Sequence, residues 1–392
     1  MKTRQLDELW REVQASPFLA GHADGCTRFA DLPIMGRAEL RALVERNFDL
    51  RRETTGVYLL RTGGTLAEAL IVPLGIDENR QQRQAMADHL RRARVFTPTT
   101  VAVNLFNYKH LYRSASIFDD LLERCDATSI GLGAITPDEF VVNFCRRLHP
   151  DTVVGTPSRL YQLASYASEA GVDLRIPRAV FGGEVMSPEY LTEMRAALGV
   201  ERLHGVYASV ENGSWGYCDH DRDGPLYRVV EEIVHVEIED PDERGVGNLV
   251  VTNTIKRRFP VFRYRNGDRG RLVERDGRQY VELVGRGDYT FRVNHRAMTE
   301  ADFAPVVAGA QRYQIQLSLT AERRTRVDVL VVPASEPASG ELDAKRRMLA
   351  TLLDDDANVD RDVRFVTPQE LQTSPTTNKT PAVVDTRQAT RW

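Results

Sequence analysis

Several short motifs combine glycines with hydroxyl or charged side chains directly after an apolar run. The first is Arg61-Thr62-Gly63-Gly64-Thr65, which follows Val57–Leu60. Its glycines let backbone N–H groups approach phosphate oxygens, and its hydroxyls add donors. It lacks the Gly-Lys-Ser/Thr ending of a Walker loop. A plain strand-to-helix turn has a similar composition, so this motif alone does not define a phosphate site.

Two carboxylates stand in similar surroundings. Glu211 ends the segment Tyr207-Ala208-Ser209-Val210-Glu211, and one protein carboxylate is enough for a Mg²⁺ that also binds nucleotide phosphates. Asp268 ends Tyr264-Arg265-Asn266-Gly267-Asp268, where a carboxylate can accept both ribose hydroxyls of a nucleotide. Taken alone, Glu211 also fits a surface charge on a loop, and Asp268 fits an ordinary turn between strands.

A lysine near the C-terminus completes the set. Lys379 lies in the polar segment Thr376-Thr377-Asn378-Lys379-Thr380. A cation in such a loop can be delivered to negative charge that develops on a phosphate. The alternative is a lysine on a flexible tail. Each signal is weak by itself, and only the set indicates nucleotide chemistry.

The elements that position these motifs alternate between strands and helices. The predicted strands are 57–60, 100–106, 153–155, 179–183 and 206–207, and the predicted helices are 81–94, 159–170 and 188–198. Such alternation is typical of an α/β sheet whose strand ends carry the site.

The pattern changes after residue 216. Predicted strands at 233–238, 248–253, 270–274 and 279–284 form a β-rich unit, and strands at 314–319, 326–332 and 363–366 with a helix at 341–353 follow. We therefore predict an N-terminal α/β domain, 1–286, with a β-rich subdomain, 216–284. A small mobile α+β domain, 287–392, completes the chain. The glycines around Asp288 suit a hinge, although they suit any tight turn equally well.

Composition narrows the class of protein. The net charge of -4 offers no basic field for nucleic acid, and no apolar stretch is long enough to span a membrane. The cysteines Cys26, Cys125, Cys145 and Cys218 form no disulfide framework, and Met1–Arg4 leads into an amphipathic helix, not a signal peptide. These features predict a cytoplasmic protein without nucleic-acid or membrane partners. They leave the oligomeric state open, and a homodimer is one of the alternatives.

The order of the motifs resembles the adenylate-forming superfamily, and within it the phenylacetate–CoA ligase-like branch. The resemblance begins near Val57 and covers most of the chain. The segments that carry it are 61–65, 154–158, 181–184, 207–211, 254–268, 285–288 and 378–387. It implies ATP and Mg²⁺ as cofactors and the adenylation of an acid with release of pyrophosphate.

The resemblance also implies a role for each site residue. Thr62, Gly63, Gly64 and Thr65 would hold the β- and γ-phosphates, and Gly182, Gly183 and Glu184 would line the adenine. Tyr207 would stack on the adenine, Ser209 would touch the α-phosphate, Glu211 would hold Mg²⁺, and Asp268 would bind the ribose. Arg286 would contact ribose or phosphate, Asp288 would mark the hinge, and Lys379 would enter as the small domain moves.

The same resemblance places the acid near Phe106, Tyr108, His110 and Tyr112, which would line a flat aromatic ring; an aromatic strand end also fits the core. The acceptor would be a thiol or an amine. The segment Tyr289–Asn294 is shorter than the family pattern and lacks its glycine, so we expect CoA to be a poor acceptor.

Three alternatives stay open at this point. One is activation of nitrite for diazotisation of an aryl amine, which the altered Tyr289–Asn294 segment keeps open. Another is a non-catalytic protein that binds a nucleotide or acyl-adenylate. The third concerns Cys218-Asp219-His220, where some members of the branch carry zinc; Cys145 or His235 are conceivable partners, although a plain loop fits the spacing better.

Overall fold

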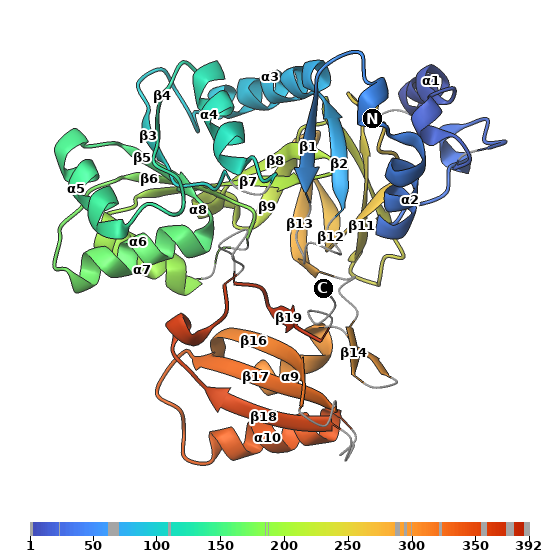
Figure 1. The fold of residues 1–392 in the computed structure, drawn as a ribbon. Helices are drawn as coiled ribbons and strands as arrows, with labels where there is room; N and C mark the ends of the chain where they lie inside the picture. The colour runs from blue at the N-terminus through green and yellow to red at the C-terminus, as the bar shows by residue number, and fades with distance from the viewer. Residues whose placement is uncertain are drawn as a thin grey trace. The chain divides into compact units, whose positions relative to one another are not determined.

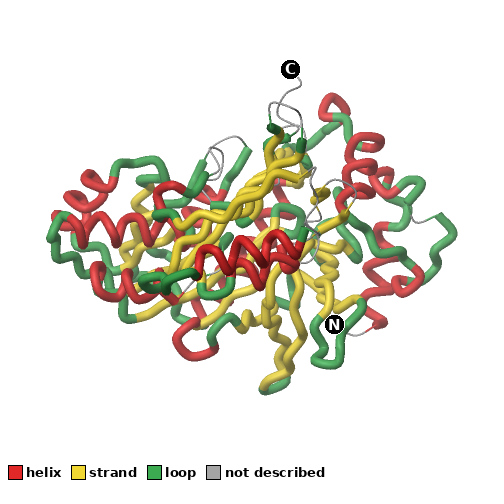
Figure 2. The backbone as a smooth tube through the Cα atoms, turned by 90° about the horizontal axis from the view of Figure 1, so that it is seen from below, coloured by secondary structure: helices red, strands yellow, loops and turns green. Residues whose placement is uncertain are grey.

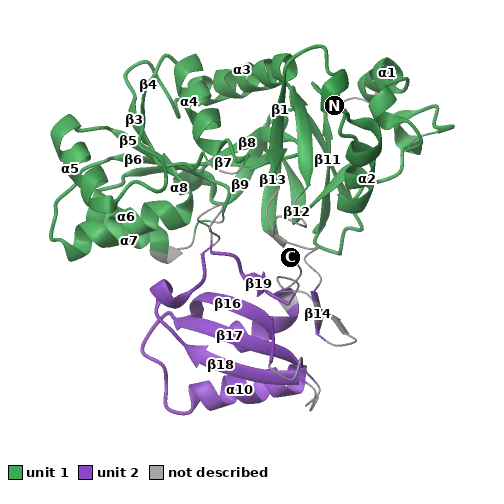
Figure 3. Ribbon diagram, viewed as in Figure 1, with its two compact units in different colours: residues 1–286 green, residues 287–392 purple. Residues whose placement is uncertain are grey.

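The computed structural model of the chain divides into two compact units, residues 1–286 and 287–392 (Figures 1 and 3). The structure describes residues 3–22, 24–61, 70–108, 111–184, 186, 188–286, 291–293, 296–298, 300–320, 324–353, 359–373 and 380–387. The predicted combination of a large α/β unit and a small α+β unit is confirmed.

Parallel strands form one half of the large sheet in unit 1. They are β3 (Val101–Asn104), β4 (Thr128–Gly131), β5 (Thr152–Gly155), β6 (Arg178–Gly182) and β7 (Arg202–Ser209), in the order β7-β6-β5-β3-β4. The helices that connect or flank them are α3 (Ile76–Arg92), α4 (Ser114–Arg124), α5 (Asp138–Leu148), α6 (Pro157–Glu169) and α7 (Pro188–Leu198). Crossover connections of this kind put helices on both faces of a parallel sheet, as Figures 1 and 2 show.

Successive residues of these strands face opposite helix layers. Val153 and Ala179 pack with α5, α6 and α7, whereas their neighbours Val154 and Val180 pack with α3 and α4. The strands are therefore apolar on both faces, which explains why they appear in the sequence as continuous apolar runs.

The other half of the same sheet is antiparallel. Its strands are β8 (Gly213–Asp219), β9 (Leu226–Val229), β10 (Val234–Glu239), β11 (Gly247–Asn253), β12 (Tyr264–Arg275) and β13 (Arg278–Arg286), in the order β10-β11-β12-β13-β9-β8. They continue the parallel strands through the pairing of β7 with β8, so the β-rich region has no separate sheet. The prediction missed β8, which contains two glycines, and β9, which is only four residues long.

The N-terminal segment covers one face of this antiparallel half. It contains α1 (Thr3–Val13), α2 (Arg37–Asn47) and the hairpin of β1 (Val57–Arg61) and β2 (Ile71–Gly75). Trp10 lies edge-on to Phe262 at 6.1 Å, and Phe18 lies edge-on to Phe259 at 5.5 Å. This aromatic layer holds the segment 259–264, and with it the start of β12, against the N-terminal helices.

Unit 2 is a small α+β domain. Its described helices are α9 (Ala304–Val307) and α10 (Glu341–Leu352). Its described strands are β14 (Phe291–Val293) and β15 (Arg296–Met298), which form a hairpin, and β16 (Ala310–Leu319), β17 (Thr325–Pro333), β18 (Val359–Phe365) and β19 (Val383–Asp385). The sheet order is β18-β17-β16-β19, and α10 packs on it through Leu349. None of the helices within the described residues has the length and apolar character needed to cross a membrane.

A histidine under the N-terminal segment makes the fold sensitive to acid. His235 of β10 lies edge-on to Phe29 at 6.2 Å, and burial, with Arg263 nearby, lowers its pKa to about 4. An unfolded histidine has a pKa of about 6.5, so below that pH the unfolded chain binds a proton that the folded chain does not take up until about pH 4. Stability is therefore lost as the pH falls through this window.

We expect His235→Gln to remove this part of the acid sensitivity. Between pH 7.5 and 5 the wild type should lose about 2 kcal/mol more unfolding free energy than the variant, from the 1.36 kcal/mol that accompanies each pKa unit. Urea unfolding followed by the fluorescence of Trp10 and Trp215 measures the difference, and His149→Asn, at an exposed histidine, is the control. Equal losses in wild type and His235→Gln would contradict this assignment.

Candidate active site

Tyr207 and Asp268 meet although 61 residues separate them. The Tyr207 hydroxyl donates to Asp268 Oδ2, and Asn266 Nδ2 donates to the Tyr207 hydroxyl at 2.9 Å. The Tyr207 ring lies perpendicular to Trp215 at a centroid distance of 4.6 Å. The end of β7 and the start of β12 therefore form one polar cluster beside an aromatic platform.

Glu211 lies in the turn between β7 and β8, where the parallel half of the sheet meets the antiparallel half. It is 8% exposed, so the alternative of a surface charge is wrong. Its Oε1 accepts a hydrogen bond from the Tyr264 hydroxyl at 2.9 Å, and among the described residues no such bond reaches Oε2. In the same turn, Ser209 Oγ accepts from the Asn212 N–H at 3.2 Å.

A buried lysine contacts the same residue. Lys256, 1% exposed, donates through Nζ to the main-chain carbonyl of Glu211. Burial lowers the pKa of Lys256 to about 8, against the opposing effect of the carboxylates Glu78 and Glu211. Glu211 is thus held at its carbonyl by Lys256 and at its carboxylate by Tyr264.

The next carbonyl of the turn is held by two amides. The Asn212 carbonyl accepts from Gln82 Nε2 of α3 at 2.5 Å and from Asn253 Nδ2 of β11 at 3.0 Å. Asn253 Oδ1 in turn accepts the N–H groups of Ile255 and Lys256, at 2.9 and 3.0 Å. A buried carbonyl needs such partners, and here they tie α3 and β11 to the turn that carries Glu211.

The loop after β6 lies close to the predicted acid pocket. A Cβ on Gly182 would come within 2.9 Å of the Val206 carbonyl and 3.7 Å of the Phe106 ring, so only glycine fits there. Phe106 is 3% exposed and stacks on Phe118 at 4.1 Å. Glu184 accepts from the Ser158 N–H and hydroxyl, both at 2.9 Å, which fixes this loop to the first turn of α6.

Tyr108 is exposed and pairs with an arginine. The Arg113 guanidinium lies over the Tyr58 ring at 3.9 Å and donates to the Tyr108 hydroxyl at 3.5 Å. In the loop after β6, described above, Gly183 has a positive φ of 81°. Phe106 and Tyr108 thus lie in the segment that follows β3, one in the core and one at the surface.

Other predicted site residues lie outside the described residues. These are Thr62, Gly63, Gly64, Thr65, His110, Asp288 and Lys379. Arg286 ends β13, and its backbone alone is described. Around the segment of Lys379, buried Gln314 donates through Nε2 to the carbonyls of Gln372 at 2.9 Å and Pro381 at 3.0 Å.

Cys218 does not lie in a loop, as the sequence had suggested. It belongs to β8, is 3% exposed, and burial raises the pKa of its thiol to about 12. His220 follows in the short helix α8 (His220–Asp223). Within the described part of the chain no group of three or more His, Cys, Asp or Glu side chains is arranged to hold a metal ion.

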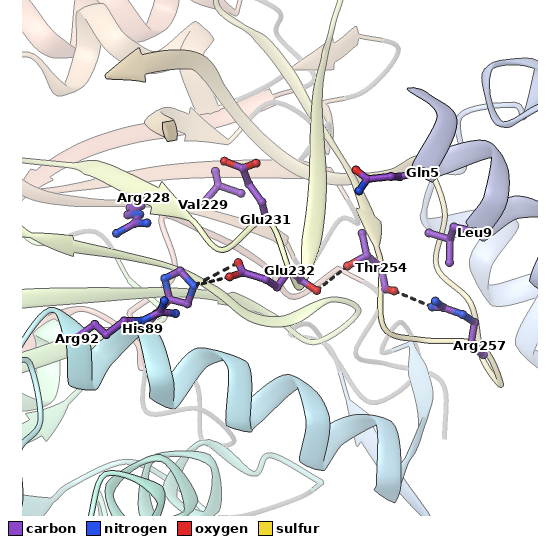
Figure 4. A pocket seen from close by; sticks show the side chains of 10 residues that line it. All are labelled: Gln5, Leu9, His89, Arg92, Arg228, Val229, Glu231, Glu232, Thr254 and Arg257. Carbon is purple, nitrogen blue, oxygen red and sulfur yellow. Dashed lines mark hydrogen bonds and ion pairs between the residues drawn. The ribbon is translucent and has the colours of Figure 1, made fainter. Parts of the chain in front are cut away.

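A further hollow of about 600 Å³ lies on unit 1, and none of the predicted site residues lines it (Figure 4). Two of its charged groups have close partners: His89 Nε2 contacts Glu232 at 3.1 Å, and Arg257 Nε contacts Glu12 at 2.7 Å. Burial lowers the pKa of His89, which favours its neutral form. The residues around the hollow are Gln5, Leu9, His89, Arg92, Arg228, Val229, Glu231, Glu232, Thr254 and Arg257.

Comparison with known proteins gives two kinds of match, although no protein family model matches the chain. Phenylacetate–coenzyme A ligase from Pseudomonas putida is 29% identical over 161 residues, which is 38% of this chain and 36% of that ligase. Indoleacetate–lysine synthetase from Pseudomonas savastanoi is 22% identical over 307 residues, 76% of this chain and 75% of that synthetase. The match to phenylacetate–coenzyme A ligase thus spans about a third of that ligase's length.

Solved structures agree on the fold. 2-Hydroxyisobutyryl-CoA ligase in the postadenylation state superimposes with a TM-score of 0.69 at 18% identity, over 99% of this chain and 89% of that chain. The fold is therefore that of the adenylate-forming enzymes. With the sequence relatives, this confirms the predicted resemblance to the phenylacetate–CoA ligase-like branch of that superfamily.

The glycine after Asn212 offers a test of how tightly the turn is built. Gly213 has φ 72°, and a Cβ there would lie 2.3 Å from Gln82 Nε2. We expect Gly213→Ala to lower the free energy of unfolding by about 2–4 kcal/mol, from left-handed strain plus overpacking. Urea unfolding measures it.

Gly277→Ala is the matched control, because Gly277 also has a positive φ, 66°, but a Cβ there meets no atom within 4 Å. Gly277→Ala should lower the free energy of unfolding through left-handed strain alone, without overpacking. If both variants lose the same stability, the Gln82 contact does not constrain the turn.

Proposed function

We propose that this chain is an adenylate-forming ligase. It would use ATP and Mg²⁺ to convert a carboxylic acid into an acyl-adenylate with release of pyrophosphate, and then transfer the acyl group to an amine or thiol. The observation that carries the proposal is the cluster at the β7–β8 turn. There a buried carboxylate, Glu211, and the Tyr207–Asp268 pair lie on a fold shared with adenylate-forming enzymes.

The first step is attack by a carboxylate oxygen on the α-phosphorus of ATP. The new bond joins that oxygen to the α-phosphorus, and the bond from the α-phosphorus to the bridging oxygen breaks, so pyrophosphate leaves with its electron pair. A phosphoryl-type transfer needs alignment and charge neutralisation more than covalent help from the protein. No side-chain nucleophile is required.

Glu211 suits the magnesium role. A hard divalent cation prefers carboxylate oxygens and usually takes one or two of them together with nucleotide phosphates. Glu211 offers a buried carboxylate whose Oε1 is oriented by Tyr264. When bound there, the cation would neutralise phosphate charge.

The nucleotide roles follow the positions of the other side chains. Asp268 would accept the ribose hydroxyls and Tyr207 would pack against the adenine, supported by Trp215. Ser209 would contact the α-phosphate from the turn that carries Glu211. Gly182, Gly183 and Glu184 would border the adenine, with Glu184 holding the loop onto α6.

The remaining roles rest on the family resemblance. Thr62, Gly63, Gly64 and Thr65 would hold the outer phosphates, Arg286 would contact ribose or phosphate, and Asp288 would mark the hinge of a mobile small domain. Lys379 would supply positive charge to the α-phosphate. Gln314 supports this last role, because it fixes the chain on both sides of the Lys379 segment.

An aromatic acid fits the named relatives, which differ in their acceptor, coenzyme A in one case and lysine in the other. Phenylacetate and indoleacetate are both aryl acetates, and Phe106, Tyr108 and His110 would border such a ring. The match to indoleacetate–lysine synthetase, whose name pairs an aryl acetate with lysine, covers three quarters of each chain and supports an amine acceptor as one of the two possibilities. The cytoplasmic location and a homodimer stay predictions.

A screen for pyrophosphate release tests the proposal. We expect ATP-dependent release with at least one aryl carboxylic acid, and we include nitrite to test the alternative. Lys379→Ala should slow release by about 10²–10³-fold, the scale of losing one charge-stabilising donor. Arg364→Ala, at an exposed cation of unit 2, should match the wild type. No release with any acid, or undiminished release by Lys379→Ala, contradicts the proposal.

The acceptor gives a separate prediction. We expect the acyl group to pass to an amine faster than to CoA, because Tyr289–Asn294 lacks the glycine that gives a backbone freedom to admit a thiol. Incubation of enzyme, ATP and the accepted acid with equal concentrations of CoA and an amine panel, read by mass spectrometry, decides. Faster formation of an acyl-CoA would show that the prediction is wrong.

A further inference from the structure

A buried ammonium group contacts the residue proposed to hold magnesium. Lys256 is 1% exposed and follows β11, and its Nζ donates to the main-chain carbonyl of Glu211 across 45 residues of sequence. Burying an ammonium group carries a large desolvation cost unless negative charge compensates it. The question is why a lysine occupies this position.

The neighbouring carbonyl shows that a charge is not needed to satisfy a buried oxygen. The Asn212 carbonyl is satisfied by two neutral amides, from Gln82 at 2.5 Å and Asn253 at 3.0 Å. The Glu211 carbonyl, one residue earlier, takes a cation instead. A positive charge at this position would also stabilise an anion, such as a nucleotide phosphate, bound near the turn.

The backbone around Lys256 is fixed from both sides. Its own N–H donates to Asn253 Oδ1 at 3.0 Å. The N–H groups of Arg257 and Arg258 donate to Glu78 Oε1, in the first turn of α3, at 2.6 and 2.8 Å. The lysine is therefore presented from a rigid segment, and its reach to Glu211 is set by α3 and β11.

Glu211 is consequently held at two points. Lys256 fixes its peptide group, and the Tyr264 hydroxyl, 2.9 Å from Oε1, fixes its carboxylate. We propose that Lys256 is a positioning residue that orients Glu211 toward Mg²⁺ and the nucleotide phosphates. This inference rests on the proposed function, because it takes Glu211 as the magnesium ligand.

The test compares two buried lysines changed in the same way. Lys256→Met keeps the length of the side chain and removes its charge and donors. Lys345→Met is the matched control, because Lys345 is 5% exposed and donates to two carbonyls of unit 2, at 3.1 Å from Val306 and 2.5 Å from Ala308. Both variants should be less stable than the wild type, but only Lys256→Met should change the dependence of activity on Mg²⁺.

Two measurements are made on each protein. One is the Mg²⁺ concentration that gives half-maximal pyrophosphate release at saturating ATP and acid. The other is calorimetric titration with ATP, in Mg²⁺ and in EDTA, which needs no acid. For Lys256→Met we expect half-saturation about tenfold higher and MgATP binding about tenfold weaker, the scale of losing a group that orients a metal ligand. ATP binding in EDTA and the KM of the acid should stay within twofold.

Unchanged magnesium dependence in Lys256→Met, or an equal change in Lys345→Met, overturns the inference while leaving the proposed function intact. If Lys256→Met does not fold, Lys256→Gln, which keeps a neutral donor, takes its place under the same criteria. A wild type that binds MgATP no better than ATP in EDTA, and releases no pyrophosphate, overturns the proposed function and this inference together.

Discussion

The main-chain carbonyls of a single buried turn organise the site. Between β7 and β8 the sheet changes from parallel to antiparallel, and the chain must pass through the interior without leaving its polar groups unsatisfied. The carbonyls of Glu211 and Asn212 are satisfied by side chains from α3, β11 and the segment after β11. The turn is therefore fixed by elements that lie far from it in sequence, and Glu211 is fixed with it.

That constraint explains the rest of the cluster. With β7 held in place, Tyr207 can bond to Asp268 of β12, although three other strands lie between them in the sheet. The N-terminal helices contribute by packing Trp10 and Phe18 on the segment before β12. Ligands of open α/β sheets bind at the carboxyl ends of strands where the topology changes, and this cluster lies at such a point.

Local patterns predicted much of the fold. Buried parallel strands appear as apolar runs, so β5 and β6 were expected at nearly the observed positions, as were the antiparallel β10 and the helices α3, α6 and α7. The helices α4 and α5 were not predicted. The glycine-rich β8 and the four-residue β9 were missed, since their local composition does not favour strands. The burial of Gln82, Asn253 and Lys256 was also not foreseen, because nothing in the adjacent sequence shows that these polar side chains turn inward. Only the tertiary partners, 41 to 130 residues away, make that burial favourable.

The central claim is that a carboxylate oxygen of the acid attacks the α-phosphorus of ATP. An accepted acid labelled with ¹⁸O in its carboxylate tests this most directly, with transfer to an amine completing the turnover and mass spectrometry of the nucleotide and phosphate products. The account predicts AMP that carries one ¹⁸O atom and pyrophosphate that carries none. Formation of ADP with label in inorganic phosphate, or of AMP without label, would contradict it.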